Sequence, residues 1–148
     1  MAIVQEKLSQ SPSYSHINLR DYVEKLVKDI LYSYGSTENI KTELNIEDLN
    51  LNMDTTMLLG LIINELITNI VKYAFNGTEG IITVNITSRS NKLEIIVADN
   101  GVWMSDNGDI SKSNTLGLQL VNKLVGQLNG SIELNTSKGT EYSISLNK

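Results

Sequence analysis

One stretch of the chain, MLLGLIINELITNIVKYAF, has the pattern of a helix that is apolar on most of its circumference. Polar residues interrupt this pattern at helical spacing and share one face: Asn64, Glu65, Thr68, Asn69, Lys72 and Tyr73. A helix with so little polar surface is normally buried, and buried amides and charges cost free energy unless partners satisfy them. Two interpretations are therefore open, a solvated face of an amphipathic helix or the wall of a site that binds a polar ligand.

Composition limits the class of protein. The 148 residues, 41% hydrophobic and 20% charged, are typical of one soluble globular domain. A net charge of −5 argues against nucleic-acid binding, and the lack of cysteine excludes disulfides and fits a reducing compartment. Uninterrupted apolar runs near the polar stripe are far shorter than the roughly 20 residues that span a bilayer. We therefore expect a cytoplasmic piece without membrane contact of its own, whose parent protein is either cytosolic or membrane-anchored.

The order of elements predicts the fold. Hydrophobic periodicity and turn residues indicate a helix from an Asn18 cap to Gly35, a helix from an Asp54 cap to about Phe75, and a helix over 115–128. Alternating patterns predict strands over 40–46, 50–53, 81–88, 92–99, 131–136 and 140–146. This order is typical of an α+β protein, a two-layer sandwich with about three helices on one face of a mainly antiparallel mixed sheet.

Three further motifs lie at the ends of these elements. Asp99-Asn100-Gly101 ends a buried strand, where Asp either forms a turn or accepts a hydrogen bond from a ligand amine such as that of adenine. Leu116-Gly117-Leu118 begins a helix, whose free N–H groups favour anions such as phosphate. Gly139-Thr140 begins the last strand and, taken alone, is typical of a hairpin turn.

Taken in this order, NELITNIVKYAF, VADNGVWM, TLGLQLV and GTEYSISL resemble the N, G1 and G2 boxes and the final Gly-Thr of the ATP-binding domain of sensor histidine kinases. That domain belongs to the superfamily of gyrase B, the heat-shock chaperone ATPases and the mismatch-repair ATPases. The segment MAIVQEKLSQS is similar to the end of a dimerisation domain. The resemblance therefore implies a remnant of that domain or linker over 1–16 and an ATP-binding catalytic domain with the Bergerat fold over 17–148.

The resemblance also implies ATP and Mg²⁺ as cofactors and assigns the site. Asn69 matches the metal-binding and catalytic Asn, and Glu65 is a candidate base. Asp99 matches the residue that binds adenine, with close backbone access at Gly101 and help from the hydroxyl of Thr140. The remaining residues expected around the nucleotide are Asn64, Lys72, Tyr73, Leu116, Gly117 and Leu118, and residues 102–114 match the ATP lid.

Two features depart from the family pattern. Trp103 replaces the second Gly of the G1 box, where an indole either stacks on the nucleotide or obstructs it. His16 is the only histidine and lies outside any matching motif, so the phosphoacceptor His is expected on a dimerisation domain absent from this chain.

The implied function is transfer of the ATP γ-phosphoryl group to that His, with a response regulator receiver domain as a later partner and this piece a monomer or weak dimer. One alternative is a partner-switching, anti-sigma-type serine kinase. The other is a degenerate, non-catalytic module that binds ATP weakly or mediates an interaction, for which Trp103 is the only support.

Overall fold

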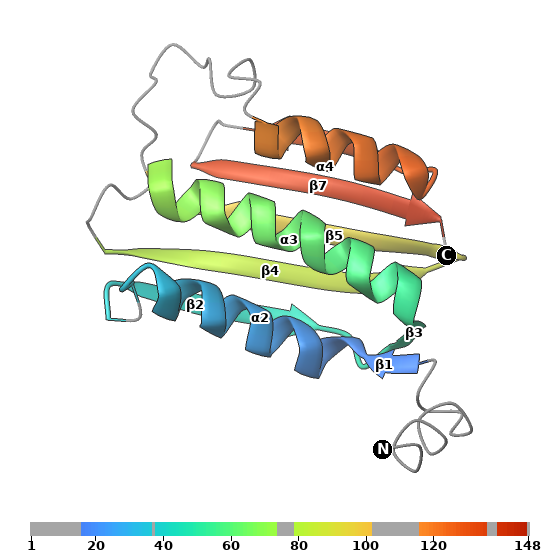
Figure 1. The fold of residues 1–148 in the computed structure, drawn as a ribbon, viewed down its shortest axis with the longest axis horizontal. Helices are drawn as coiled ribbons and strands as arrows, with labels where there is room; N and C mark the ends of the chain where they lie inside the picture. The colour runs from blue at the N-terminus through green and yellow to red at the C-terminus, as the bar shows by residue number, and fades with distance from the viewer. Residues whose placement is uncertain (1–15, 37, 74–78, 102–115, 136–138, 148) are drawn as a thin grey trace, which may run out of the picture.

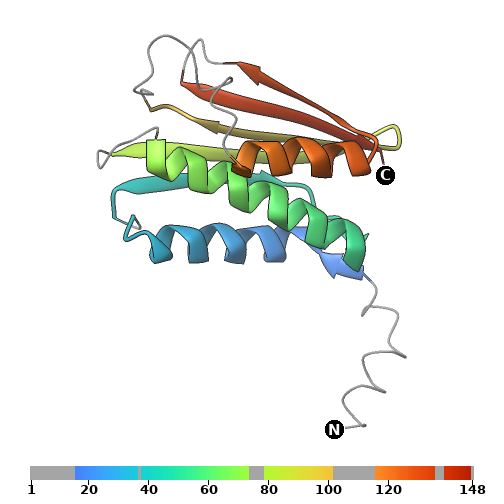
Figure 2. The same cartoon turned by 45° about the horizontal axis from the view of Figure 1, so that its top comes forward.

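The computed structural model describes residues 16–36, 38–73, 79–101, 116–135 and 139–147. Within these residues, three helices pack on one face of a five-stranded sheet, and a two-stranded sheet lies beside them (Figure 1). Figure 2 shows the two layers after rotation, with the helices on the same side of the sheet. The predicted two-layer α+β sandwich is confirmed.

The helices are α2 (Leu19–Ser33), α3 (Met53–Tyr73) and α4 (Leu116–Gln127). As predicted, Asn18 caps α2, since its side-chain Oδ1 accepts a hydrogen bond from the Asp21 backbone N–H at 2.9 Å. Gly35 follows α2 with φ +66°, a left-handed conformation that favours glycine and ends the helix. Local sequence therefore determines both ends of α2.

The large sheet has the strand order β2-β4-β5-β7-β6. Its strands are β2 (Ile40–Ile46), β4 (Gly80–Arg89), β5 (Lys92–Asp99), β6 (Ser131–Asn135) and β7 (Thr140–Asn147). The β2–β4 pair is parallel and the other three pairs are antiparallel, which confirms a mixed, mainly antiparallel sheet. In the small sheet, β1 (His16–Asn18) pairs with β3 (Asn50–Asn52) in antiparallel orientation. The sequence did not predict β1, in which His16 lies opposite Asn52.

The core lies between the sheet and α3. Alternate residues of the three central strands point toward the helices and are buried: Ile82, Val84, Ile86, Leu93, Ile95, Val97, Tyr142, Ile144 and Leu146. Helix α3 lies between α2 and α4 and contacts both (Figure 1). Its buried apolar side chains, all 0% exposed, are Leu59, Ile62, Ile63, Leu66, Ile67 and Ile70. Helix α3 is therefore the central element of the helical layer.

The uninterrupted apolar runs of α3 are short, as the sequence indicated, but the helix as a whole is long and apolar. Within the described residues, Met53–Lys72 is one helix whose length and mean hydropathy are sufficient for a membrane span. The polar residues interrupt every apolar run, but the mean hydropathy of the helix remains high enough for a span. Half of this stretch is buried inside the fold, where it forms the core described above.

The N-cap of α3 is Asn52 rather than the predicted Asp54. Asn52 Oδ1 accepts a hydrogen bond from the Thr55 backbone N–H at 2.8 Å, and the Asn52 carbonyl accepts one from Thr56 Oγ1 at 2.9 Å. Asp54 lies instead in the first turn, where its charge interacts favourably with the helix dipole. Both residue types are good caps, so the sequence alone does not distinguish them.

Asn52→Ala is expected to lower the free energy of unfolding by about 0.5–2 kcal/mol, because the Thr55 N–H loses its partner. Asp54→Ala removes only a dipole interaction and should cost about 0.3–1 kcal/mol. Urea unfolding of both variants measures the difference. A larger loss in Asp54→Ala than in Asn52→Ala would contradict the assignment of the cap.

Candidate functional site

The predicted carboxylate and hydroxyl are brought together by strand pairing. Asp99 ends β5 and lies directly opposite Thr140, the first residue of β7, while Ile82 of β4 lies on the other side of Asp99. Asp99 is 6% exposed and Thr140 is 1% exposed, although both are polar. The sheet thus places a carboxylate and a hydroxyl side by side at the end of the apolar row that faces the helices.

The end of β5 is held by a set of local hydrogen bonds. Asp99 Oδ1 accepts a bond from the Gly101 backbone N–H at 2.8 Å. Asn100 Oδ1 accepts one from the Ile81 N–H at 2.8 Å, which ties this end of the strand to β4. The contact with the Gly101 N–H fixes the orientation of the Asp99 carboxylate.

Gly139 has a structural role that the sequence did not reveal. It has φ +82°, and a Cβ on this residue would collide with the carbonyl oxygen of Asp99. Glycine therefore allows the start of β7 to approach the end of β5 closely enough to pair Thr140 with Asp99. The sequence interpretation of Gly139-Thr140 as an ordinary hairpin turn was incomplete, because the close contact depends on the register of β5 and β7.

The polar stripe of α3 is partly a solvated face and partly buried. Asn69 is 7% exposed, whereas Lys72 is exposed to solvent. The half-buried members of the stripe are Asn64, Glu65 and Thr68. Tyr73 ends α3, and its side chain lies outside the described part of the structure. Neither of the two original interpretations therefore applies to the whole stripe.

Four chain segments that carry predicted site residues meet at one end of the molecule. Figures 1 and 2 show the last turn of α3 and the first turn of α4 at the end of the sheet where β5 ends and β7 begins. Helix α4 begins at Leu116, close to the predicted position, and Leu118 packs half-buried against the core. The side chains of Leu116 and Gly117, the predicted lid over 102–114 and Trp103 lie outside the described residues.

Three buried polar atoms lack hydrogen-bond partners within the described part of the chain. They are Asn69 Nδ2, Thr140 Oγ1 and Tyr142 Oη. Leaving a buried polar group without a partner costs about 1–3 kcal/mol, so such groups are rare in folded proteins. Thr140 and Tyr142 are cross-strand neighbours of Asp99, and Asn69 lies near the end of α3, so these atoms mark a candidate site for a polar ligand.

Tyr142 is the member of this set that sequence reasoning missed. It occupies a helix-facing position of β7 that continues with Ile144 and Leu146, so the alternating pattern of the strand indicates only a core position there. Burial, together with the smaller effect of the negative charge of Asp99, raises the pKa of Tyr142 to about 12. The hydroxyl is therefore protonated, and a hydrogen-bond donor, throughout the physiological range.

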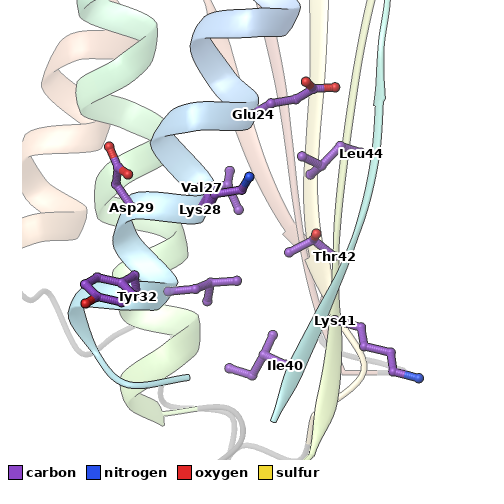
Figure 3. A pocket seen from close by; sticks show the side chains of 10 residues that line it. Glu24, Val27, Lys28, Asp29, Tyr32, Ile40, Lys41, Thr42 and Leu44 are labelled. Atoms are coloured by element: carbon purple, nitrogen blue, oxygen red, sulfur yellow. The ribbon is translucent and has the colours of Figure 1, made fainter. Parts of the chain in front are cut away.

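A separate groove of about 960 Å³ lies between α2 and the edge strand β2 (Figure 3). Val27, Leu31 and Ile40 form its apolar floor, and charged residues such as Lys28 and Lys41 lie along it. None of the predicted site residues lines this groove. The polar cluster around Asp99 is therefore a different feature from the groove.

The structure is an α+β two-layer sandwich with a buried Asp–Thr pair at the end of its sheet, and sequence comparison identifies its family. Residues 54–148 match the model of the histidine kinase-, DNA gyrase B- and HSP90-like ATPases, and the chain belongs to this family. Residues 1–34 match a second model, described as histidine kinase.

Individual relatives agree with this assignment. The chain is 28% identical over 142 residues to the sensor histidine kinase PdtaS of Mycobacterium tuberculosis, a match that covers 93% of this chain and 28% of PdtaS. It is 39% identical over 80 residues to the serine-protein kinase RsbW of Bacillus cereus, covering 45% of this chain and 50% of RsbW. The chain thus spans under a third of the length of PdtaS.

Solved structures share the fold. The histidine kinase domain of the Erythrobacter litoralis EL346 blue-light activated histidine kinase superposes with a TM-score of 0.78 at 22% identity, covering 88% of this chain and 61% of that one. The catalytic domain of histidine kinase ThkA gives a TM-score of 0.67 at 17% identity and covers 90% of this chain and 94% of that one.

Gly139→Ala is expected to destabilise the protein by at least about 1–2 kcal/mol, because Ala disfavours positive φ and its Cβ collides with the Asp99 carbonyl. The matched control is Gly126→Ala in α4, where an added Cβ meets no atom within 4 Å. That change should be neutral or stabilising by up to about 1 kcal/mol. Chemical denaturation compares them, and equal stability of the two variants would rule out a required close contact at Gly139.

Proposed function

We propose that the chain is the ATP-binding catalytic module of a two-component sensor histidine kinase. In this proposal it transfers the γ-phosphoryl group of ATP to a histidine on a dimerisation domain of the parent chain. The observation that carries the proposal is the buried Asp99–Thr140 pair, with unpartnered polar atoms around it, in a member of this ATPase family. The histidine kinase match over residues 1–34 and the coverage of PdtaS support this specific activity.

Asp99 and Thr140 are proposed to bind the adenine base. The exocyclic amino group of adenine is a donor, and the Asp99 carboxylate is an acceptor already oriented by the Gly101 N–H. The Thr140 hydroxyl, buried and unpartnered among the described residues, can bond to the base or to a water that bridges it to Asp99. Gly101 lets the base approach the backbone beside this pair.

The α3 stripe and the start of α4 are proposed to hold the phosphates. Lys72, which is exposed near the end of α3, supplies a positive charge for the phosphates. Asn64 and Tyr73, the other stripe residues assigned to the nucleotide, are proposed to help position it and to pack on its base or ribose. The helix N-terminus at Leu116–Leu118 provides backbone N–H groups for phosphate oxygens.

A Mg²⁺ ion is proposed to accompany ATP, with the Asn69 amide as its protein ligand. The described ranges contain no group of three His, Cys, Asp or Glu side chains that could hold a metal ion, so this part of the chain offers no metal cage of its own. The amide oxygen of the nearly buried Asn69 side chain fits this role, since Mg²⁺ in nucleotide sites takes one or two protein oxygens together with phosphate oxygens. When bound, the ion neutralises phosphate charge.

The transfer itself is a displacement at phosphorus. An imidazole nitrogen of the acceptor forms the new bond to the γ-phosphorus, the bond to the β,γ-bridging oxygen breaks, and ADP leaves. Glu65, half-buried one turn before Asn69, is the candidate to accept the imidazole proton. The chain's main contribution is to position the nucleotide.

The domain boundary, partners and location form part of the same proposal. We place the catalytic domain at 17–148 and the end of the dimerisation domain or linker at 1–16. The partners are then a dimerisation domain in cis and a response regulator receiver domain, without nucleic acid or membrane contact by this piece. It is proposed to be cytoplasmic and, alone, a monomer or weak dimer.

A serine kinase of the partner-switching type is the second candidate, favoured by the 39% identity to RsbW over 80 residues. That match covers less than half of the chain, whereas the PdtaS match extends over 93% of it. The non-catalytic alternative rests on Trp103 alone, and the buried polar site argues against it.

Phosphoryl transfer is tested by mixing the chain with Mg²⁺-ATP and a separately produced, His-containing dimerisation domain of the parent. We expect phosphohistidine, which is labile in acid and stable in base, because the module supplies the donor and the added domain the acceptor. The same mixture with the acceptor His changed to Gln is the control. Acid-stable phosphoserine on a partner protein would instead support the serine kinase.

Nucleotide binding is tested by calorimetry on site variants. Asp99→Asn should weaken ATP binding by about tenfold or more, because a charge-assisted acceptor is lost. Asn69→Ala should weaken binding more in Mg²⁺ than in EDTA, since Asn69 acts through the metal. Asn45→Ala, an exposed amide in β2 bonded to Asn85, is the matched control and should bind as the wild type does. A wild-type chain that binds no ATP at millimolar concentration would refute the proposal.

A further inference from the structure

Tyr142 lies one strand position away from the proposed adenine site. On the helix-facing side of the sheet, Asp99 is opposite Thr140, and the next pair on the same side is Val97 opposite Tyr142. Tyr142 is therefore a diagonal cross-strand neighbour of Asp99, a separation that an aromatic side chain can bridge. The effect of the Asp99 charge on the tyrosine is consistent with this placement.

The hydroxyl of Tyr142 is unfavourable for the protein without a ligand. The side chain is 2% exposed, and its oxygen has no hydrogen-bond partner among the described residues. The following residues of the same row, Ile144 and Leu146, are aliphatic, so the position requires only apolar volume. Phenylalanine would fill the same space without burying a polar atom. The hydroxyl therefore needs a partner that the described chain does not supply.

We propose that the Tyr142 hydroxyl is a further base-recognition group, which donates a hydrogen bond to a ring nitrogen of adenine, directly or through one water. This inference rests on the proposed ATP-binding function. It adds a further polar contact to the Asp99–Thr140 pair. Tyr142 donates a hydrogen bond to the base, whereas the Asp99 carboxylate accepts one. The tyrosine remains protonated at physiological pH, so it is available as a donor.

The combination of an acceptor and a donor selects one purine. The edge of adenine presents an amino donor beside the acceptor N1, which matches the acceptor Asp99 and the donor Tyr142. Guanine presents a carbonyl acceptor beside an N1–H donor, so both contacts are mismatched and buried polar groups are left unpaired. Tyr142 is thus inferred to be a specificity-determining residue for adenine nucleotides over guanine nucleotides.

The experiment compares Tyr142→Phe with Tyr22→Phe. Tyr22 is a matched control because its ring packs on Gly60 of α3, away from Asp99, and its substitution also removes one phenolic hydroxyl. Calorimetry with ATP and with GTP gives affinity and selectivity, and thermal unfolding without nucleotide gives stability. Tyr142→Phe should bind ATP about 2- to 10-fold more weakly and discriminate less against GTP, with an apo melting temperature equal to or above that of the wild type. Tyr22→Phe should leave both affinities unchanged.

The outcomes separate this inference from the function on which it rests. Wild-type ATP binding with unchanged affinity and selectivity in Tyr142→Phe would overturn the role of the hydroxyl and leave the proposed function standing. Lower apo stability with unchanged affinity would also overturn it, since the hydroxyl would then be structural. Failure of the wild type to bind ATP would remove both proposals together.

Discussion

The burial of α3 against the sheet is the interaction on which the rest of the structure depends. Six of its aliphatic side chains are fully buried, and burial of each contributes about 1.5–3 kcal/mol of transfer free energy. Helices α2 and α4 pack on either side of α3, so most of its circumference is covered. Asn69 is the polar residue of the stripe that this packing buries, near the end of α3 where β5 ends and β7 begins.

Much of the fold could be predicted because its signals are local. Asn18 and Gly35 mark the ends of α2 by cap chemistry, and the alternation along β5 and β7 identifies their buried face. The parallel pairing of β2 with β4 has no such local signal, since strand partners are chosen by tertiary packing. The prediction of the α3 cap was wrong for a related reason. Strand β3 ends at Asn52, directly before the helix, so two residues with capping side chains lie near the helix start.

The candidate site was predictable where its residues form motifs and was missed where they act through register. Asp99, Asn69 and Thr140 belong to recognisable boxes, and the structure buries all three. Gly139 and Tyr142 gain their significance only once Asp99 is paired with Thr140, because that pairing brings Gly139 against the Asp99 carbonyl and Tyr142 diagonal to its carboxylate. A strand pattern read alone cannot supply this cross-strand information.

A buried polar cluster at the end of an apolar core couples binding to stability. Asn69, Thr140 and Tyr142 each bury an atom that has no partner among the described residues, and each such atom lowers the stability of the free protein. A ligand that satisfies these atoms binds the folded state alone, since the unfolded chain does not assemble the site, and it therefore stabilises the fold by mass action. The same desolvation strengthens each contact to the ligand, because hydrogen bonds are stronger in a medium of low dielectric constant. In the proposed function, the polar residues that interrupt this core are therefore the groups that bind the nucleotide.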